Sequence, residues 1–438
     1  MKKQNSVTLR RSFLHKFADD VFGCLKKGEC ASCMFAAGGG KRTIFNFLLS
    51  EGIIIKNIFG NKYEKTLFIY VDPDEILNIS SEAYLHLIFA KLALRMNEND
   101  VQVFSDHLIN NPLILIKKNL ENLIIQDWHI VFILNDFEFT LSLPSSIYLN
   151  LESIMSVDKS RITYLFLSTI NLFDEDVLKN FHNLKHAISR NVIFFPLFNQ
   201  NESDCLVDRI CEKTKSKIPD KAKSVLFELC GGHPQLLKYS FNNLCEQGQE
   251  LLNDYKKIGS YLTNHFQLNI VCADIWNFLS AKEKEVMTSI VIKRMFSPSL
   301  GEAADYLTKL GLIKKITDKK YQVFGVLFEQ FIKKKLPKHR LIFDTDTKKL
   351  YYGGQSCEDK FTYQEFKLLT YFVSHENELV SRDQVAEAIW GRLFHDKYSD
   401  WSIDKIISIL RKKLDALGCP SEYLVTLKKR GFSYSNPA

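Results

Sequence analysis

Short, continuously apolar runs alternate with helical patterns over the first two hundred residues, and this alternation restricts the fold more than any other feature. The runs expected as strands are 31–37, 65–71, 129–134, 161–168 and 191–195. A strand that is apolar at nearly every position is buried on both faces, which is typical of a parallel sheet between two layers of helices. Helical patterns at 41–49, 80–96 and 113–125 separate these runs. The alternation therefore predicts an α/β, three-layer sandwich over residues 1–200.

The architecture is expected to change after Pro196, because helical patterns replace the buried strands. The patterns at 203–213, 221–229, 235–246 and 251–269 predict a small helical lid over residues 201–270. Residues 271–335 combine helices, among them 302–310 and 326–335, with a hairpin near 311–324, and this order resembles the winged helix that follows the lid in AAA-like and STAND-type ATPases. Pro337 interrupts the following basic stretch and marks a linker to a last domain at 341–438.

The composition is that of a globular chain and excludes several classes of protein. Hydrophobic residues make up 46% and charged residues 25% of the 438 positions, and no apolar run is long enough for a membrane span. The polar N-terminus lacks the apolar core of a signal peptide. We therefore expect a cytoplasmic protein with no membrane partner, in which the ten scattered cysteines are reduced. Cys30 and Cys33 have CxxC spacing without a second pair, so no metal site is expected.

A glycine run lies between the expected strand 31–37 and the expected helix 41–49. Gly38, Gly39 and Gly40 directly precede Lys41. Glycines at such a turn let backbone N–H groups surround a phosphate, and a helix N-terminus adds a favourable field. Lys41 is placed to reach the β- and γ-phosphates. A structural turn without a ligand is the alternative, because a glycine-rich turn alone is a weak motif.

The same segment resembles a P-loop with two departures. Phe35 stands where the first motif glycine is expected, and Arg42 stands where a Ser or Thr ligates Mg²⁺. Thr43 matches a second hydroxyl that contacts the α-phosphate. Because Mg²⁺ requires oxygen ligands, Arg42 removes a ligand and adds a cation. Its guanidinium suits a direct contact with a phosphate oxygen instead.

Three further segments extend the resemblance to STAND/AAA-like (origin-recognition-like) P-loop ATPases. The strand 130–134, followed by Asn135 and Asp136, resembles a Walker B strand with Asn135 at the place of the metal-associated Asp. The segment 164–169, followed by Asn171, resembles the sensor strand, and Gly232-His233-Pro234 resembles the lid turn that faces the nucleotide. The resemblance implies a catalytic candidate, Asp136, and a nucleotide site made of Gly38, Gly39, Gly40, Lys41, Arg42, Thr43, Asn135, Asn171, His233 and Pro234.

These residues imply ATP or ADP as the ligand and argue against Mg²⁺ as its companion. Arg42 and Asn135 both remove support for the metal, so we expect no ATPase activity or only a weak one. A vestigial, empty site is the alternative.

The last hundred residues contain a helix with two different faces. The apolar face is formed by Ile403, Ile406, Ile407, Leu410 and Leu414. The opposite face carries Lys405, Ser408, Arg411 and Lys412. Such a helix fits the major groove of DNA. A strand at 424–427, which includes Thr426, leads into a basic turn made of Lys428, Lys429 and Arg430. This turn is expected to contact phosphate or the minor groove.

The order of motifs over 341–438 resembles the OmpR/PhoB-type winged helix-turn-helix domain of bacterial regulators. The matching segments are 361–369, 381–391, 410–414 and 426–432. The resemblance implies double-stranded DNA as the partner and transcription regulation as the process. Residues 341–438 contain fourteen Lys or Arg and fourteen Asp or Glu. Because the domain is neutral overall, a solvated helix and an ordinary charged hairpin are the alternative.

Basic residues are concentrated in front of that domain. Residues 309–340 contain ten Lys or Arg against two Asp or Glu, an excess of eight in a chain whose net charge is +7. A second polyanion-facing surface and a solvated basic surface are equally favoured there.

The expected fold class is α/β: a P-loop three-layer sandwich with a helical lid, followed by two winged-helix domains. The expected function is a DNA-binding transcription regulator with a degenerate nucleotide-binding module that senses or assembles. Two alternatives stay open: an ATP-hydrolysing switch that acts on DNA or a protein partner, and a nucleotide-dead protein-binding scaffold. A homo-oligomer or a signalling protein is a further class of partner.

Overall fold

The computed structural model describes residues 11–106, 110–247, 254–292, 295–317, 320–336, 340–345, 347–353, 355–391, 399–420, 423–428 and 430–436. The chain divides into two compact units. The first consists of Met1–Ala281, Glu302–Lys314 and Phe324–Phe328, and the second of Lys282–Gly301, Lys315–Val323 and Glu329–Ala438. The division passes through the segment 271–335, so the four domain boundaries expected from the sequence remain predictions.

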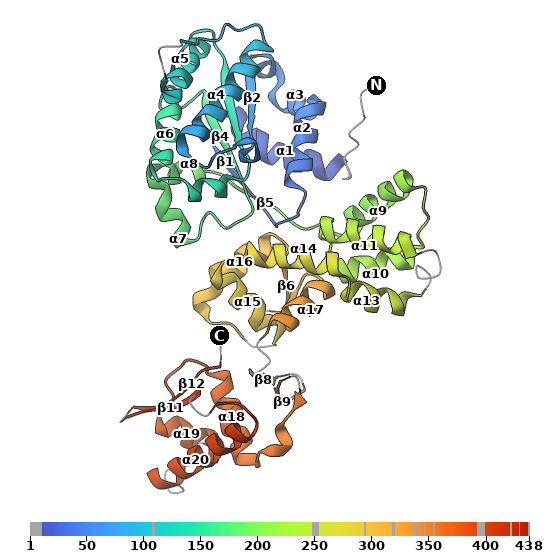
Figure 1. Ribbon diagram of the computed structural model, residues 1–438, viewed down its shortest axis with the longest axis vertical. Coiled ribbons are helices and arrows are strands. Elements are labelled where there is room, and N and C mark those ends of the chain that lie inside the picture. Colours follow the sequence, from blue (N-terminus) through green and yellow to red (C-terminus); the bar gives the residue numbers. More distant parts are fainter. Residues whose placement is uncertain are drawn as a thin grey trace. The chain divides into compact units, whose positions relative to one another are not determined.

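A five-stranded parallel sheet forms the centre of the first unit (Figure 1). Its strands are β1 (Ala31–Phe35), β2 (Thr66–Val71), β3 (His129–Leu134), β4 (Ile162–Ser168) and β5 (Val192–Phe195), in the order β2-β3-β4-β1-β5. All four pairings are parallel. Every residue of β1 and β4 is buried, as expected for strands covered on both faces. The predicted parallel sheet is therefore confirmed.

Helices lie on both sides of this sheet (Figure 1). They are α1 (Arg11–Lys26), α2 (Lys41–Glu51), α3 (Ile53–Phe59), α4 (Ser81–Asn97), α5 (Pro112–Ile125), α6 (Ser146–Met155), α7 (Glu175–Leu178) and α8 (Lys185–Ile188). Aromatic side chains join them to the strands. Phe17 of α1 and Phe45 of α2 meet Phe35 of β1 edge to face, while Phe137 meets Phe166 of β4. Such pairs add about 0.5–1.5 kcal/mol each beyond the burial of their area.

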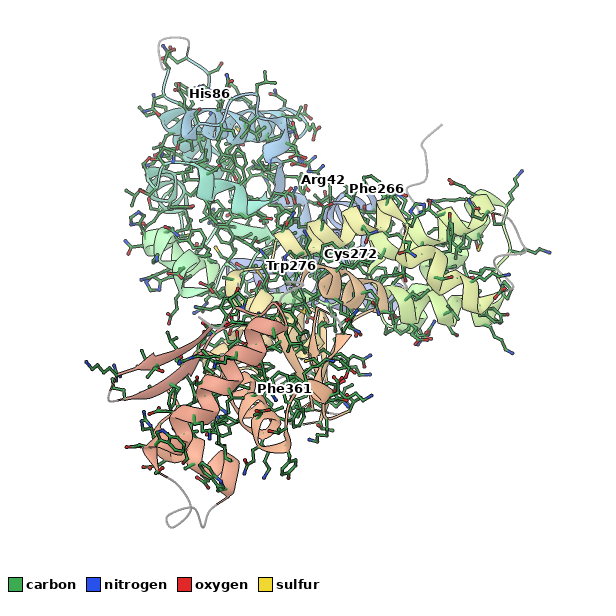
Figure 2. All side chains as sticks on the ribbon, turned by 60° about the horizontal axis from the view of Figure 1, so that its bottom comes forward. Arg42, His86, Phe266, Cys272, Trp276 and Phe361 are labelled. Carbon is green, nitrogen blue, oxygen red and sulfur yellow. The ribbon has the colours of Figure 1, made fainter. Side chains whose placement is uncertain are left out.

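A bundle of helices follows β5. It contains α9 (Gln200–Thr214), α10 (Asp220–Cys230), α11 (Pro234–Gln247), α13 (Tyr255–Thr263) and α14 (Phe266–Asn277). The single helix expected at 251–269 is wrong over its described part. Backbone of extended geometry at His265 separates α13 from α14. Helix α14 has the exposed Phe266 at its start and the buried Cys272 on another face (Figure 2).

The segment after the bundle contains α15 (Ala281–Val291), α16 (Gly301–Lys309) and α17 (Val326–Lys335). Between α16 and α17, strands β6 (Ile313–Thr317) and β7 (Lys320–Val323) form a two-stranded sheet. The order of elements agrees with the helices and hairpin expected there.

The terminal segment begins with a three-stranded sheet of β8 (Leu341–Asp344), β9 (Lys349–Tyr352) and β10 (Gln355–Ser356). Three helices follow, α18 (Tyr363–Ser374), α19 (Arg382–Trp390) and α20 (Asp400–Ala416), and then the hairpin of β11 (Leu424–Leu427) and β12 (Gly431–Tyr434). Leu368, Phe372, Ile403, Leu410 and Phe432 belong to one buried cluster drawn from all these parts. The order of elements is that of the winged helix expected from the sequence.

Side-chain caps set the starts of the three helices in this segment. The side chains of Thr362, Ser381 and Ser399 each accept a hydrogen bond from the backbone N–H of the third residue of their helix, and the side chain of that residue accepts one from the backbone N–H of the cap. Such caps stabilise a helix by about 1 kcal/mol.

Among the described residues, no single helix is long and apolar enough to cross a membrane. One pair of helices, Lys41–Glu51 and Ile53–Lys65, passes that test together but is bent by 71°.

Candidate functional site

The loop between β1 and α2 has the backbone shape of a phosphate cradle. Gly40 precedes α2 with a φ of 89°, in the left-handed region that residues with side chains rarely adopt. Gly38 has a φ of 72°, and a side chain there would overlap the amide oxygen of Gln235. The residue that caps α2 makes no side-chain hydrogen bond to the helix. The first N–H groups of α2 are therefore placed for a ligand at the loop.

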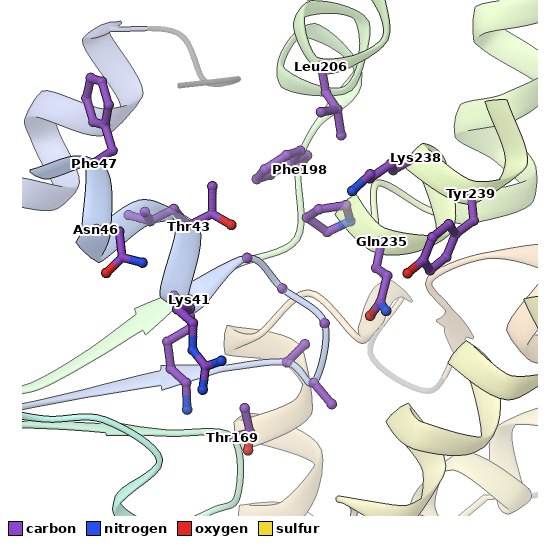
Figure 3. A pocket seen from close by; sticks show the side chains of 18 of the residues that line it. Lys41, Thr43, Asn46, Phe47, Thr169, Phe198, Leu206, Gln235, Lys238 and Tyr239 are labelled. Carbon is purple, nitrogen blue, oxygen red and sulfur yellow. The ribbon is translucent and has the colours of Figure 1, made fainter. Parts of the chain in front are cut away.

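A cavity of about 1100 Å³ opens at this loop, within the first unit. Four cations line it: Lys41, Arg42, Lys213 and Lys238. Four aromatic residues line it as well: Phe47, Phe198, Tyr239 and Phe278. Figure 3 shows Gln235, Lys238 and Tyr239 facing the loop from α11. Cations suit phosphates and aromatic rings suit a flat base, so the wall has the chemistry for both parts of a nucleotide.

His233 connects the start of α11 to the loop between β1 and α2. Its Nε2 lies 2.7 Å from the backbone oxygen of Ala37, and its Nδ1 lies 3.3 Å from the backbone nitrogen of Leu236. The ring is therefore a neutral tautomer that donates from Nε2 and accepts at Nδ1. Complete burial lowers the pKa of His233 to about 4. His233 thus bonds to the backbone of the loop, whereas Pro234 lines the cavity.

Lys41 is engaged by acidic groups at the end of β3. Its Nζ lies 2.5 Å from Oδ1 of Asp136 and 3.8 Å from Glu138. Only 8% of the Lys41 side chain is exposed. Asp136 adopts a φ of 46°, and the Nδ2 of Asn135 donates to its other oxygen at 2.7 Å. A phosphate at the cradle would therefore compete with Asp136 for the lysine.

Arg42 lies among three carboxylates. Its Nη2 lies 2.5 Å from Asp74, 3.2 Å from Asp72 and 3.5 Å from Asp136. The hydrogen bond to Asp74 raises the pKa of the guanidinium. The structure thus places Arg42 against acidic side chains, whereas the sequence favoured a direct contact with phosphate.

Asn135 and Asn171, the residues expected at the Walker B and sensor positions, are not among the residues that line the cavity. Asn135 is fully buried and is absent from the cavity wall, and its Oδ1 has no hydrogen-bond partner among the described residues. Asn171 accepts a bond from the backbone of Phe173. Thr169 lines the cavity instead and donates its hydroxyl to Glu138. The polar residue after β4 that lines the cavity is therefore Thr169, two positions before Asn171.

Several residues in or beside the cavity were not found from the sequence. Asp72 directly follows β2 and Asp74 lies two positions later, and an acidic pair after a buried strand was an available signal. Lys213 and Lys238 lie on α9 and α11. Lysines on helices are commonly solvated, so no pattern distinguished these two.

Helix α20 carries the candidate DNA interface. Its buried residues are Ile403, Ile407, Leu410 and Leu414, while Ile406 is partly buried. Lys405, Ser408 and Lys412 are exposed, as expected. Lys405 Nζ lies 4.9 Å from the centre of the Trp401 ring. The acidic residues Asp400 and Asp404 of the same helix both pair with Arg382 of α19, which offsets their charge.

Arg411 is placed differently from the other polar residues of α20. Its Nε donates to the backbone oxygen of Leu424 at 2.8 Å, and its Nη2 donates to the hydroxyl of Thr426 at 2.8 Å. Partial burial lowers the pKa of Arg411. Arg411 and Thr426 therefore join α20 to β11, where the sequence indicated residues that face outward.

The turn of the β11–β12 hairpin has exposed cations at Lys428 and Arg430, and Lys429 lies outside the described residues. Gly431 has a φ of 134°, and a side chain there would overlap the backbone oxygen of Val380. Close contact between the hairpin and the start of α19 thus fixes where the basic turn lies.

Some of the basic residues in the stretch 309–340 contact other side chains of the protein. Lys333 pairs with Glu329, and Lys309 lies over the ring of Phe194. Lys314 and Lys315 are exposed on β6. The expectation of a polyanion-facing surface there stays a prediction.

Comparison with known proteins identifies the terminal segment. Residues 358–434 match the family "Transcriptional regulatory protein, C terminal". The chain is 41% identical over 71 residues to the alkaline phosphatase synthesis transcriptional regulatory protein SphR of Synechococcus elongatus, covering 16% of this chain and 26% of SphR. It is 30% identical over 93 residues to the transcriptional regulatory protein YvrH of Bacillus subtilis, covering 21% and 37%. The chain thus spans about a quarter to a third of the length of these relatives.

Solved structures resemble the rest of the chain. The Walker-type ATPase PABY2304 of Pyrococcus abyssi superposes with a TM-score of 0.52 at 11% identity, over 76% of this chain and 97% of that one. The ORC2 protein of Aeropyrum pernix, in its ADPNP–ADP complexes, gives a TM-score of 0.45 at 14% identity, over 76% and 96%. The first similarity shows the P-loop ATPase fold. The chain therefore joins this fold to a transcriptional-regulator-type C-terminal domain. Both resemblances drawn from the sequence are confirmed, the ATPase one as a fold and the regulator one as a family match over residues 358–434.

Proposed function

We propose that this chain is a transcription regulator that binds double-stranded DNA through α20 and the β11–β12 hairpin. In this proposal the P-loop module binds ATP or ADP as a signal for sensing or assembly and hydrolyses it weakly or not at all. Lys405, Ser408 and Lys412 contact DNA from α20, and Lys428 and Arg430 contact it from the turn.

The observation that carries the proposal is the division of α20 into two faces within a domain of the regulator family. Four aliphatic residues anchor the helix in the core, so its exposed lysines are held in a defined direction. Arg382 pairs with Asp400 and Asp404, which reduces their repulsion of phosphates. The exposed cations Lys405, Lys412, Lys428 and Arg430 all lie on α20 and the hairpin turn, although residues 341–438 are neutral in total.

The nucleotide part of the proposal rests on the cradle and the cavity. Gly38 and Gly40 supply the backbone, and Lys41 supplies a cation at the loop. Weak hydrolysis is expected because Asn135 provides no carboxylate and Asp136 is occupied by Lys41. An ATP-hydrolysing switch is less well supported for the same reason. A scaffold that binds only proteins gives no account of the basic face of α20.

DNA binding is tested with the full chain and a pool of duplex oligonucleotides with a random centre. Selected duplexes are titrated against the unaltered chain and a Lys405→Ala/Lys412→Ala variant at several salt concentrations. Loss of two phosphate contacts should weaken binding and reduce the salt slope by about two.

Lys349→Ala serves as the matched control, because Lys349 is exposed on β9, outside α20 and the hairpin. Its affinity and salt slope should equal those of the unaltered chain. Equal affinity in a folded double variant would refute the recognition-helix assignment.

A further inference from the structure

Three carboxylates converge beside the phosphate cradle, although one of them is more than sixty positions away in the sequence from the other two. Asp72 and Asp74 follow β2, and Asp136 follows β3. Each offers an oxygen atom, and these atoms all lie within 4.8 Å of one another. Parallel strands end at the same edge of a sheet, so the pairing of β2 with β3 brings the three together.

A cation belonging to the chain already lies among these oxygens. Nη2 of Arg42 is within 3.5 Å of all three carboxylates. Asp72 is buried, so its charge has little access to water and depends on a partner inside the protein. Arg42 is that partner. Its position, the second residue of α2, keeps the guanidinium beside the cradle.

A divalent cation does not fit this arrangement while Arg42 is present. Mg²⁺ requires near-octahedral oxygen ligands at about 2.0–2.1 Å. The guanidinium engages the oxygens that would coordinate the ion, and its positive charge would repel it. The hydroxyl that P-loops supply to the metal is missing from the same position, because the residue there is Arg42. Arg42 thus replaces the hydroxyl that would bind the metal ion and also pairs with the three carboxylates that could bind it.

We propose that Arg42 is a built-in cation that takes the place of a divalent metal ion at the cradle. The unaltered chain therefore binds nucleotide independently of Mg²⁺, and loss of Arg42 opens a divalent-cation site formed by Asp72, Asp74 and Asp136. Asn135 is not required for that site. The part concerning nucleotide rests on the proposed function, whereas the part concerning the cation does not.

The test measures binding of Mn²⁺ to the full chain without nucleotide, by electron paramagnetic resonance and calorimetry. Arg42→Ser should bind one Mn²⁺ ion at the three carboxylates. Its affinity for that ion should be at least about tenfold higher than the affinity of the unaltered chain at the same place. Arg42→Ser/Asp74→Asn should lose that gain, because a carboxylate is removed. Arg190→Ser is the matched control: Arg190 also pairs with a carboxylate, Glu29, in the same unit, and its loss should create no site.

Thermal unfolding keeps the test decisive if the loss of Arg42 destabilises the fold. Without Arg42 the three carboxylates keep only Lys41, beside Asp136, and repel one another, so Arg42→Ser should melt earlier and Mn²⁺ should restore its melting temperature. The unaltered chain should show no such response at this site. The proposal is overturned if folded Arg42→Ser gains no site. It is also overturned if the unaltered chain already binds Mn²⁺ in a manner that Asp74→Asn abolishes.

A second arm separates this inference from the proposed function. ATP is titrated into the unaltered chain with Mg²⁺ and with a chelator, and equal affinities are expected. Affinity that disappears with the chelator would overturn the inference, since Arg42 would then not replace the metal. Absence of nucleotide binding under both conditions would refute the nucleotide part of the proposed function and leave the Mn²⁺ result to decide the role of Arg42.

Discussion

Single residues at the cradle act by holding their neighbours, and His233 is the clearest case. Both ring nitrogens of this buried histidine are used by backbone atoms, one from the loop and one from α11. Protonation at Nδ1 would remove the acceptor for Leu236 and place a charge on a fully buried side chain. The contact between lid and loop therefore requires the neutral ring.

We predict that the first unit loses stability as the pH falls from about 6.5 to about 4, partly because of His233. The folded pKa is depressed, so the unfolded chain takes up the proton first, and the contribution is complete only above the unfolded pKa. The loss from this group is about 3 kcal/mol over that range. Denaturant unfolding at several pH values compares the unaltered chain with His233→Gln, which keeps a donor but does not titrate. His186→Gln, at an exposed position on α8, is the control. Parallel stability curves for the unaltered chain and His233→Gln would contradict the prediction.

At the scale of elements, Arg411 connects α20 to the β11–β12 hairpin. The guanidinium reaches two positions of β11, so the orientation of the hairpin depends on this side chain. Lys413 similarly joins α20 to Glu365 of α18, at 2.6 Å. The cations of α20 thus divide into those that hold the domain together and those that are exposed.

We predict that Arg411→Ala and Lys412→Ala have different effects on stability. Loss of two hydrogen bonds from a charged group should cost about 1.5–3 kcal/mol and speed hydrogen exchange in β11 and β12. Lys412→Ala should change the stability by less than about 0.5 kcal/mol, because Lys412 is exposed. Hydrogen exchange measured by mass spectrometry on the full chain compares the two. Unchanged exchange in the hairpin of Arg411→Ala would show that the two bonds contribute little.

At the scale of the whole molecule, the chain contains two compact units, and the cavity at the glycine loop and the candidate DNA interface belong to different ones. The buried cluster of the terminal segment is made only of residues between Leu341 and Tyr434. The first unit has its own core around the parallel sheet. The first unit and the terminal segment therefore each have a core of their own.

We predict two thermal transitions, of which ATP raises only the one that belongs to the first unit. A ligand at a hundred times its Kd stabilises the folded state by about 2.7 kcal/mol, which calorimetry readily detects. Lys41→Ala should abolish the shift, because the cradle loses its buried cation. Lys91→Ala is the control, since Lys91 lies on α4 and pairs with Glu75. One transition that moves as a whole would show that the units unfold together.

The kinds of element in this protein were determined by local sequence patterns. Continuous apolar runs required strands buried on both faces, and apolar residues three or four apart required helices. The glycines at 38–40 specified a turn for phosphate, and the isoleucines of α20 specified its buried face. These features depend on spacing along the chain, so the sequence alone was sufficient for the fold class, while the two candidate sites that it indicated remain predictions.

The partners of individual side chains were decided only by the tertiary structure. The strand order β2-β3-β4-β1-β5 brings Asp72, Asp74 and Asp136 to Arg42, although they follow different strands. The end of β4 places Thr169 in the cavity in preference to Asn171, and the packing of the hairpin directs Arg411 to β11. Sequence spacing describes one element at a time. Which elements meet depends on burying all their apolar faces at once, and that determines which charges meet.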